Sequence, residues 1–139
     1  MINLERAKSY TKRFEGLRLK PYICPAGKLT IGYGHNLEDN GITEEIAVNM
    51  LDADLKSAEK EIRAKFTGYN KLNEARQFVL VDMTFNMGIN KLLTFRKMFA
   101  ALAKGEYPTA ALEMKDSKWY RQVGNRGKIL CEIMKSGEY

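Results

Sequence analysis

The eight residues from Phe78 to Phe85 are apolar on nearly every side of a helix. A helix without a polar face is normally buried at the centre of a bundle. Asn73 and Glu74 lie just before this run; Asn is a preferred helix cap, and an acidic first turn complements the helix dipole. The run therefore predicts a helix that starts near residue 73 and lies at the core of a helical bundle.

Similar start and stop signals mark further helices. Asn3 can cap a helix that extends to about Arg13, and Gly16 then ends it. Thr43, followed by two acidic residues, starts a helix with a thin apolar stripe. We expect this helix, at about 43–66, to connect two lobes. Apolar spacing and flanking glycines predict three shorter helices, over 95–104, 109–114 and 125–136.

Between the first two helices the apolar pattern changes from helical to alternating. Large apolar side chains alternate over 17–22 and 28–33, and a Pro-Ala-Gly turn separates the two segments. Pro21 confines the first strand to a sheet edge or a bulge, because proline lacks the backbone donor. We therefore expect an α+β fold dominated by helix. It would be one domain over 1–139, with a hairpin lobe at about 15–42 and the connecting helix at about 43–66. The helical lobe would consist of residues at about 67–139 together with the first helix.

The net charge of the chain indicates which classes of binding partner are compatible with it. The 139 residues carry 23 Lys and Arg against 17 Asp and Glu, a formal net charge of +6, and 45% of them are hydrophobic. These proportions are typical of a soluble globular domain, and the positive charge favours a nucleic acid, a membrane surface or an acidic cell-wall polymer. No window holds 18 uninterrupted apolar residues, and the chain opens with charged residues where a secretory signal has its apolar region. Two cysteines and one histidine are too few for a disulfide-stapled or zinc module.

Three residues near the predicted hairpin stand out for their chemistry. Glu15 follows Phe14 at the end of the first helix, and a carboxyl group beside apolar surface stays protonated more readily, as a general acid requires. Cys24 lies at the hairpin turn and Thr30 on the returning strand, so both can face a cleft bordered by Glu15. Taken singly, each of these residues is more often structural than catalytic. The spacing of the three residues along the chain is what favours a catalytic role for them together.

The order Glu15, eight residues, Cys24, five residues, Thr30 resembles the catalytic pattern of bacteriophage-type lysozymes. These are the endolysin muramidases of glycoside hydrolase family 24, in which the middle position is Asp or Cys. Four further segments are similar to the family: Phe-Glu-Gly-Leu-Arg-Leu-Lys at 14–20, Thr-Ile-Gly-Tyr-Gly-His at 30–35, Phe-Asn-Met-Gly at 85–88 and Trp-Tyr-Arg-Gln-Val-Gly-Asn-Arg at 119–126. The resemblance covers essentially the whole chain and implies a two-lobed lysozyme-like fold.

The resemblance also implies a reaction, hydrolysis of the β-1,4 bond between N-acetylmuramic acid and N-acetylglucosamine in peptidoglycan. Glu15 would protonate the leaving glycosidic oxygen. Cys24 and Thr30 would position or activate the water that attacks the anomeric carbon from the opposite face, which gives inversion of configuration.

Two chemical roles are open for Cys24, that of a thiolate and that of a group that orders the water together with Thr30. Free cysteine has a pKa of about 8.5, so a thiolate role needs neighbours that lower it. Three basic residues lie nearby in the sequence and could do so: Arg18, Lys20 and Lys28. A disulfide to Cys131 is the structural alternative, which synthesis in a reducing cytosol disfavours. Cys131 itself has the neighbours of a core residue.

Five further residues have roles implied by the resemblance. Arg126 matches an arginine that lies against the catalytic glutamate and would orient it. Phe85 and Lys118 are candidate substrate contacts, although Phe85 is equally compatible with core packing. His35, the single histidine, is predicted to be structural and to pair with Asp52 on the long helix.

Three other functions are the alternatives to a muramidase. A lytic transglycosylase also uses one catalytic glutamate but needs no partner that holds water, so Cys24 and Thr30 would be idle. A cell-wall-binding module without catalysis would tolerate the loss of Glu15. A nucleic-acid module needs clustered basic residues with stacking aromatics or a recognised motif. We find neither and expect no nucleic-acid partner.

The resemblance further implies a setting in bacterial lysis. The enzyme would be made in the cytoplasm of the host bacterium and would reach the periplasm and cell wall only after a holin opens the membrane. Because the chain begins directly at the predicted first helix, we expect no stable membrane anchoring. A tail-associated lysozyme is the other setting left open. The sequence carries no signal for a metal, a cofactor or an oligomer, and we expect a monomer that needs no cofactor.

Overall fold

Polar side chains begin several of the helices. In the computed structural model, which describes residues 1–139, the Asn3 side chain accepts a hydrogen bond from the backbone N–H of Arg6 at 3.0 Å and caps helix α1 (Leu4–Glu15). Asn73 caps α4 (Glu74–Met87) in the same way, through the N–H of Arg76 at 3.0 Å. Each cap satisfies a backbone donor that has no partner inside its helix.

The chain divides into two compact units, Met1–Asn49 (unit 1) and Met50–Tyr139 (unit 2). The boundary falls within the long helix α3 (Glu44–Lys65), close to the predicted 43–66. The predicted lobe boundaries, and the grouping of the first helix with the helical lobe, stay predictions.

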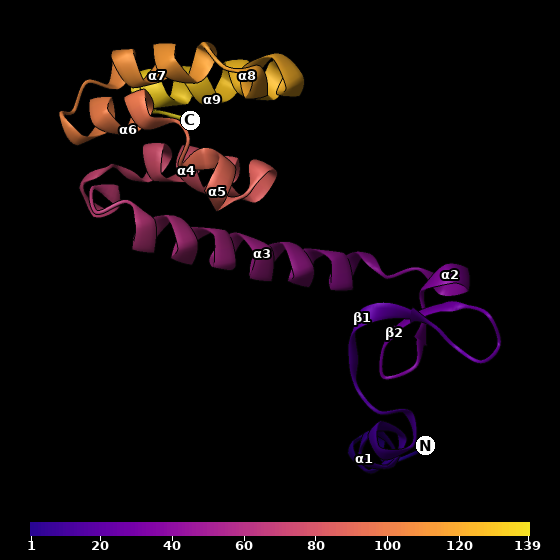
Figure 1. Ribbon diagram of the computed structural model, residues 1–139. Coiled ribbons are helices and arrows are strands. Elements are labelled where there is room, and N and C mark those ends of the chain that lie inside the picture. Colours follow the sequence, from indigo (N-terminus) through magenta and orange to yellow (C-terminus); the bar gives the residue numbers. More distant parts are fainter. The chain divides into compact units, whose positions relative to one another are not determined.

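Unit 1 contains a three-stranded antiparallel sheet in the order β1 (Arg18–Ile23), β2 (Leu29–Gly32) and β3 (His35–Asn36). The strands β1 and β2 are marked in Figure 1. The predicted hairpin is confirmed as β1 and β2, with Tyr22 opposite Thr30. The register shifts between Arg18 and Tyr22, within the segment that contains Pro21. Proline cannot donate to the ladder, and its place in an irregular edge strand agrees with the prediction.

The short helix α2 (Leu37–Asn40) is not among the helices expected from the sequence. Its cap is Asn36, whose side chain accepts from the N–H of Asp39. The helix is a single turn, which is too short to show an apolar period in the sequence.

Unit 2 is helical throughout. The 3₁₀ turn η1 (Tyr69–Lys71) lies between α3 and α4. After α4 the elements are α5 (Ile89–Leu92), α6 (Arg96–Ala103), α7 (Tyr107–Lys115), α8 (Lys118–Val123) and α9 (Asn125–Ser136). Helix α9 has the predicted bounds. Helix α7 starts two residues early, because Pro108 suits the first helical turn. Helices make up 68% of the chain, so the helix-dominated α+β fold is confirmed.

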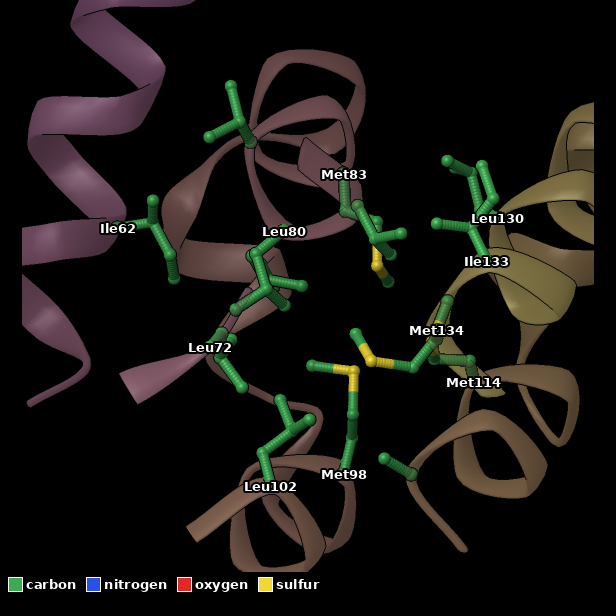
Figure 2. Packing of buried hydrophobic residues seen from close by; sticks show 14 of the residues in the cluster. Ile62, Leu72, Leu80, Met83, Met98, Leu102, Met114, Leu130, Ile133 and Met134 are labelled. Atoms are coloured by element: carbon green, nitrogen blue, oxygen red, sulfur yellow. The ribbon is translucent and has the colours of Figure 1, made fainter. Parts of the chain in front are cut away.

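The core of unit 2 surrounds α4, as predicted. Val79, Leu80 and Met83 are completely buried. Figure 2 shows the side chain of Met83 directed toward Met98 of α6 and Met134 of α9, so flexible thioethers fill the space where three helices meet.

None of the helices combines the length and the apolar character needed to cross a bilayer.

Candidate active site

Glu15 is the last residue of α1 and is exposed. The helix ends there because Gly16 turns the chain, and the Gly16 N–H donates to the Lys12 carbonyl at 2.9 Å. The carboxyl group of Glu15 lies over Gly34, in the turn between β2 and β3. The predicted acid is thus held at a helix end against the sheet of its own unit.

Cys24 and Thr30 are joined through one backbone atom. The carbonyl oxygen of Lys28 accepts the N–H of Cys24 at 2.9 Å and the hydroxyl of Thr30 at 2.8 Å. Thr30 is only 3% exposed, whereas Cys24 is partly exposed. The structure therefore brings the two predicted water-binding residues together at the turn end of the β1–β2 hairpin.

The environment of Cys24 favours its thiolate. The backbone N–H of Lys28 and the side chain of Thr30 lower the pKa of the Cys24 thiol. Burial opposes them, and the N–H groups of Ala26 and Cys24 itself add contributions that are smaller than the effect of burial. The Thr30 hydroxyl has a single proton, which it gives either to the Lys28 carbonyl or to the sulfur. When Thr30 donates to the Lys28 carbonyl, the Lys28 N–H is still the largest single cause of the lowered Cys24 pKa.

The source of this effect differs from the one expected from the sequence. Nearby basic side chains were the predicted cause of a lowered Cys24 pKa, but hydrogen bonds lower it instead. The Lys28 ammonium is paired with Asp39 at 3.2 Å and with Glu38 at 3.5 Å. The Arg18 guanidinium lies over the Tyr22 ring, 4.2 Å from its centre.

Both cysteines are free thiols. Cys131 packs against the core of unit 2, as expected. Burial raises the pKa of the Cys131 thiol to about 11, against a smaller opposing effect of the Lys115 charge.

His35 is held within unit 1. Its Nε2 atom lies 2.6 Å from the carbonyl oxygen of Gly41 and so links β3 to the end of α2. This contact agrees with a structural role. Asp52, in unit 2, accepts a bond from Lys56 at 2.9 Å. The pairing of His35 with Asp52 stays a prediction.

Arg126 makes a two-pronged ion pair inside unit 2. Its Nε and Nη2 atoms donate to the two carboxylate oxygens of Asp82 at 2.8 and 2.9 Å. The pair joins α9 to α4, and the hydrogen bond from Arg126 to Asp82 raises the pKa of Arg126. The guanidinium keeps its Nη1 edge free for a further acceptor.

A groove of about 800 Å³ lies in unit 2 between α4, α6, α7 and α8. Lys118 lines it, together with Trp119, Glu113 and Asn86. The indole N–H of Trp119 donates to the Asn86 side chain at 3.0 Å and so fixes one wall. Phe85 does not line this groove, and the residue is 40% exposed.

Comparison with known proteins decides the family. The family model described as phage lysozyme matches residues 12–134. The chain belongs to the phage lysozyme family. As a member of this family the protein is a glycosidase that hydrolyses peptidoglycan.

Individual relatives agree with this assignment. The chain is 28% identical to the probable T4-type lysozyme 1 of Dictyostelium discoideum, over 94% of each chain. It is 33% identical to an endolysin of Acyrthosiphon pisum secondary endosymbiont phage 1, over 87% of this chain and 82% of that one. It is also 27% identical to the pre-baseplate central spike protein Gp5 of Enterobacteria phage T4, over 91% of this chain but only 27% of the relative.

Three residues that contribute to this site were not identified from the sequence: Asp82, Asn86 and Gly34. Asp82 is a charge within an otherwise apolar run, and such a residue is rarely buried without a partner. That rule alone could have pointed to a cation on another helix. Asn86 and Gly34 belong to segments that resemble the family, but only the structure shows Asn86 bonded to Trp119 and Gly34 beneath Glu15.

Proposed function

We propose that the protein cleaves the β-1,4 bond between N-acetylmuramic acid and N-acetylglucosamine with inversion at the anomeric carbon. Glu15 is the general acid, and Cys24 and Thr30 hold or activate the attacking water. The observation that carries this proposal is the shared Lys28 carbonyl, which fixes Cys24 and Thr30 side by side in the unit that also holds Glu15.

The acid step requires a carboxyl group that substrate can reach. Glu15 is exposed, and no ammonium or guanidinium group of unit 1 pairs with it. In its protonated form it donates to the glycosidic oxygen as the bond to the anomeric carbon breaks. Proton transfer by a positioned acid accelerates such reactions by about 10²–10⁴-fold.

The water step requires an acceptor for a proton. When Thr30 donates to the Lys28 carbonyl, its oxygen keeps lone pairs that can accept a hydrogen bond from water. The Cys24 thiolate, favoured by backbone donors, takes the proton that the water loses as its oxygen bonds to the anomeric carbon. Glu15 is left ionised and Cys24 protonated, and exchange with solvent restores both.

Residues of unit 2 complete the proposal as substrate-binding or orienting groups. Arg126 offers the free edge of a fixed guanidinium, Lys118 lines the groove, and Phe85 presents an exposed ring. Of these three residues Lys118 alone lines the groove, where a charged side chain can orient a polar ligand.

We propose lysis of the host bacterium as the setting, in line with the relative that is called an endolysin. In this proposal the enzyme is a monomer that stays in the host cytoplasm and gains access to the periplasm and cell wall through a holin. It binds no nucleic acid and has no stable membrane anchoring.

The proposal is tested by the products formed from purified peptidoglycan. Hydrolysis yields fragments with a reducing end, whereas a lytic transglycosylase yields 1,6-anhydro ends of lower mass. Glu15→Gln should reduce the release of reducing ends by at least about 100-fold. Glu5→Gln is the matched control, since Glu5 is an exposed residue of the same helix that pairs with Lys8. Anhydro products would contradict the proposal, as would full activity of Glu15→Gln.

A further inference from the structure

Gly34 leaves room for the carboxyl group of Glu15. A Cβ atom on Gly34 would lie 2.5 Å from Oε2 of Glu15, 2.6 Å from its carboxyl carbon and 3.1 Å from its Cγ. Carbon atoms in van der Waals contact are separated by about 3.5–4.0 Å. Any side chain at position 34 would therefore occupy the space in which the end of Glu15 lies.

A second contact places the last turn of α1 over the same turn of the sheet. The Lys12 ammonium lies 5.5 Å from the centre of the Tyr33 ring, next to Gly34 in the chain. Lys12 and Glu15 are three residues apart and share one face of the helix. The carboxyl group of Glu15 is thus backed by the Gly34 backbone on one side, while the residue remains exposed.

We propose that Gly34 is a positioning residue for the general acid. Because Gly34 has no side chain, the carboxyl group of Glu15 can lie directly against the backbone of the turn. This inference rests on the proposed function, in which Glu15 donates the proton. A methyl group at position 34 pushes the carboxyl group aside by about 1 Å, whereas a general acid must lie within about 2.6–3.2 Å of the oxygen that it protonates.

The chain contains a matched control two residues away. Gly32 has φ +71° and Gly34 has φ +72°, so an alanine at either site is held in the same unfavourable left-handed backbone. A Cβ atom on Gly32 meets no atom within 4 Å. Gly32→Ala therefore introduces the backbone strain without the contact to Glu15.

The experiment compares kcat, KM and the melting temperature of Gly34→Ala and Gly32→Ala on purified peptidoglycan fragments. We expect similar losses in melting temperature for the two variants. Gly34→Ala should lose kcat on the order of 100-fold, as expected for a misplaced catalytic group, with KM nearly unchanged. Gly32→Ala should stay within about threefold of the original kcat, because Glu15 is not displaced.

A second pair guards against poor folding of the alanine variants. Gly34→Asn and Gly32→Asn carry the same Cβ atoms, but asparagine tolerates a positive φ better than alanine. The same difference in kcat is expected between them. Equal kcat for the two members of both pairs overturns the inference.

The outcome is distinguishable from a failure of the proposed function. If Glu15→Gln is inactive while Gly34→Ala and Gly34→Asn turn over normally, Glu15 is the acid and only the role of Gly34 is wrong. If Glu15→Gln is fully active, the assignment of the acid is wrong, and the role of Gly34 fails with it.

Discussion

At the scale of single residues, the two cysteines have opposite environments. Hydrogen bonds from the Lys28 N–H and the Thr30 side chain lower the pKa of Cys24. Burial raises the pKa of Cys131 to about 11. Because the thiolate is the reactive form of cysteine, the two thiols differ in reactivity as well as in position.

We predict that an alkylating agent at neutral pH modifies Cys24 well before Cys131 and that activity is lost with the first modification. Mass spectrometry of tryptic peptides, taken alongside a lysis assay, measures both. Cys131→Ala should be as sensitive as the original protein. Cys24→Asp should keep substantial activity and resist the reagent, because a carboxylate can take the same proton. Normal lysis by protein alkylated at Cys24 would refute the role of this thiol.

The raised pKa of Cys131 also leads to a prediction of how the stability of the protein changes at alkaline pH. Its pKa is raised in the folded state, from an unfolded value of about 8.5, so the neutral thiol is favoured by folding. This contribution is fully present below pH ~8.5 and is lost as the pH rises toward 11.

The free energy of unfolding should therefore fall more steeply between pH 9 and 11 in the original protein than in Cys131→Ala. Urea unfolding in a reducing buffer at a series of pH values measures the difference, in which the tyrosines common to both proteins cancel. Parallel curves for the two proteins would show that Cys131 is not shielded by folding.

At the scale of elements, the ion pair between Asp82 and Arg126 ties α4 to the first turn of α9. The Asp82 side chain is 15% exposed and that of Arg126 is 39% exposed. Partly exposed pairs are screened by solvent, but the loss of one partner leaves the other charge without its hydrogen bonds.

We predict that Arg126→Met destabilises the protein by about 1–3 kcal/mol because Asp82 is left unpaired. The double variant Asp82→Leu, Arg126→Met should be destabilised less than Arg126→Met alone, since it leaves no charge behind. Urea unfolding of the original protein, the two single variants and the double variant gives the four members of a double-mutant cycle. If the two single losses simply add up in the double variant, the pair does not act as a unit.

Local signals in the sequence predicted the elements that depend on local physics. Asn3 and Asn73 cap helices where expected, and α9 has its predicted bounds. The one-turn helices α2 and α5 were missed because they are too short to show a period. The partners of Arg126 and Trp119 lie 44 and 33 residues away in the chain, and no local pattern reports such contacts.

The candidate site was predictable to the same degree. The spacing of Glu15, Cys24 and Thr30 pointed to the residues, but not to the Lys28 carbonyl that joins two of them. The lowering of the Cys24 pKa by the Lys28 N–H could not be predicted either, because every residue type except proline has this backbone group. The contact between Glu15 and Gly34 depends on how α1 docks on the sheet of unit 1.

At the scale of the whole molecule, the net charge of +6 bears on the substrate. Residues 11–30 contain five basic side chains and a single acidic one, Glu15. This segment includes all three proposed catalytic residues. A positive region around a site attracts an anionic polymer and raises its local concentration.

We predict that salt weakens lysis of whole cell walls more than cleavage of short neutral oligosaccharides. The Debye length falls from about 10 Å at 0.1 M to about 3 Å at 1 M ionic strength, so long-range attraction is screened. Initial rates on the two substrates over this range measure the effect, with sucrose at equal osmolarity as the control. If salt lowered the initial rates on both substrates equally, the positive charge would not contribute to binding of the cell wall.

The anomeric configuration of the first product tests the proposed mechanism most directly. Proton NMR of the reaction on a defined peptidoglycan fragment, recorded before the sugar equilibrates, distinguishes the two anomers. Glu15 as acid with water held by Cys24 and Thr30 predicts the α-anomer from the β-linked substrate, for the original protein and for Cys24→Asp. An initial β-anomer would mean retention through a covalent intermediate, and it would contradict the proposed roles of Cys24 and Thr30.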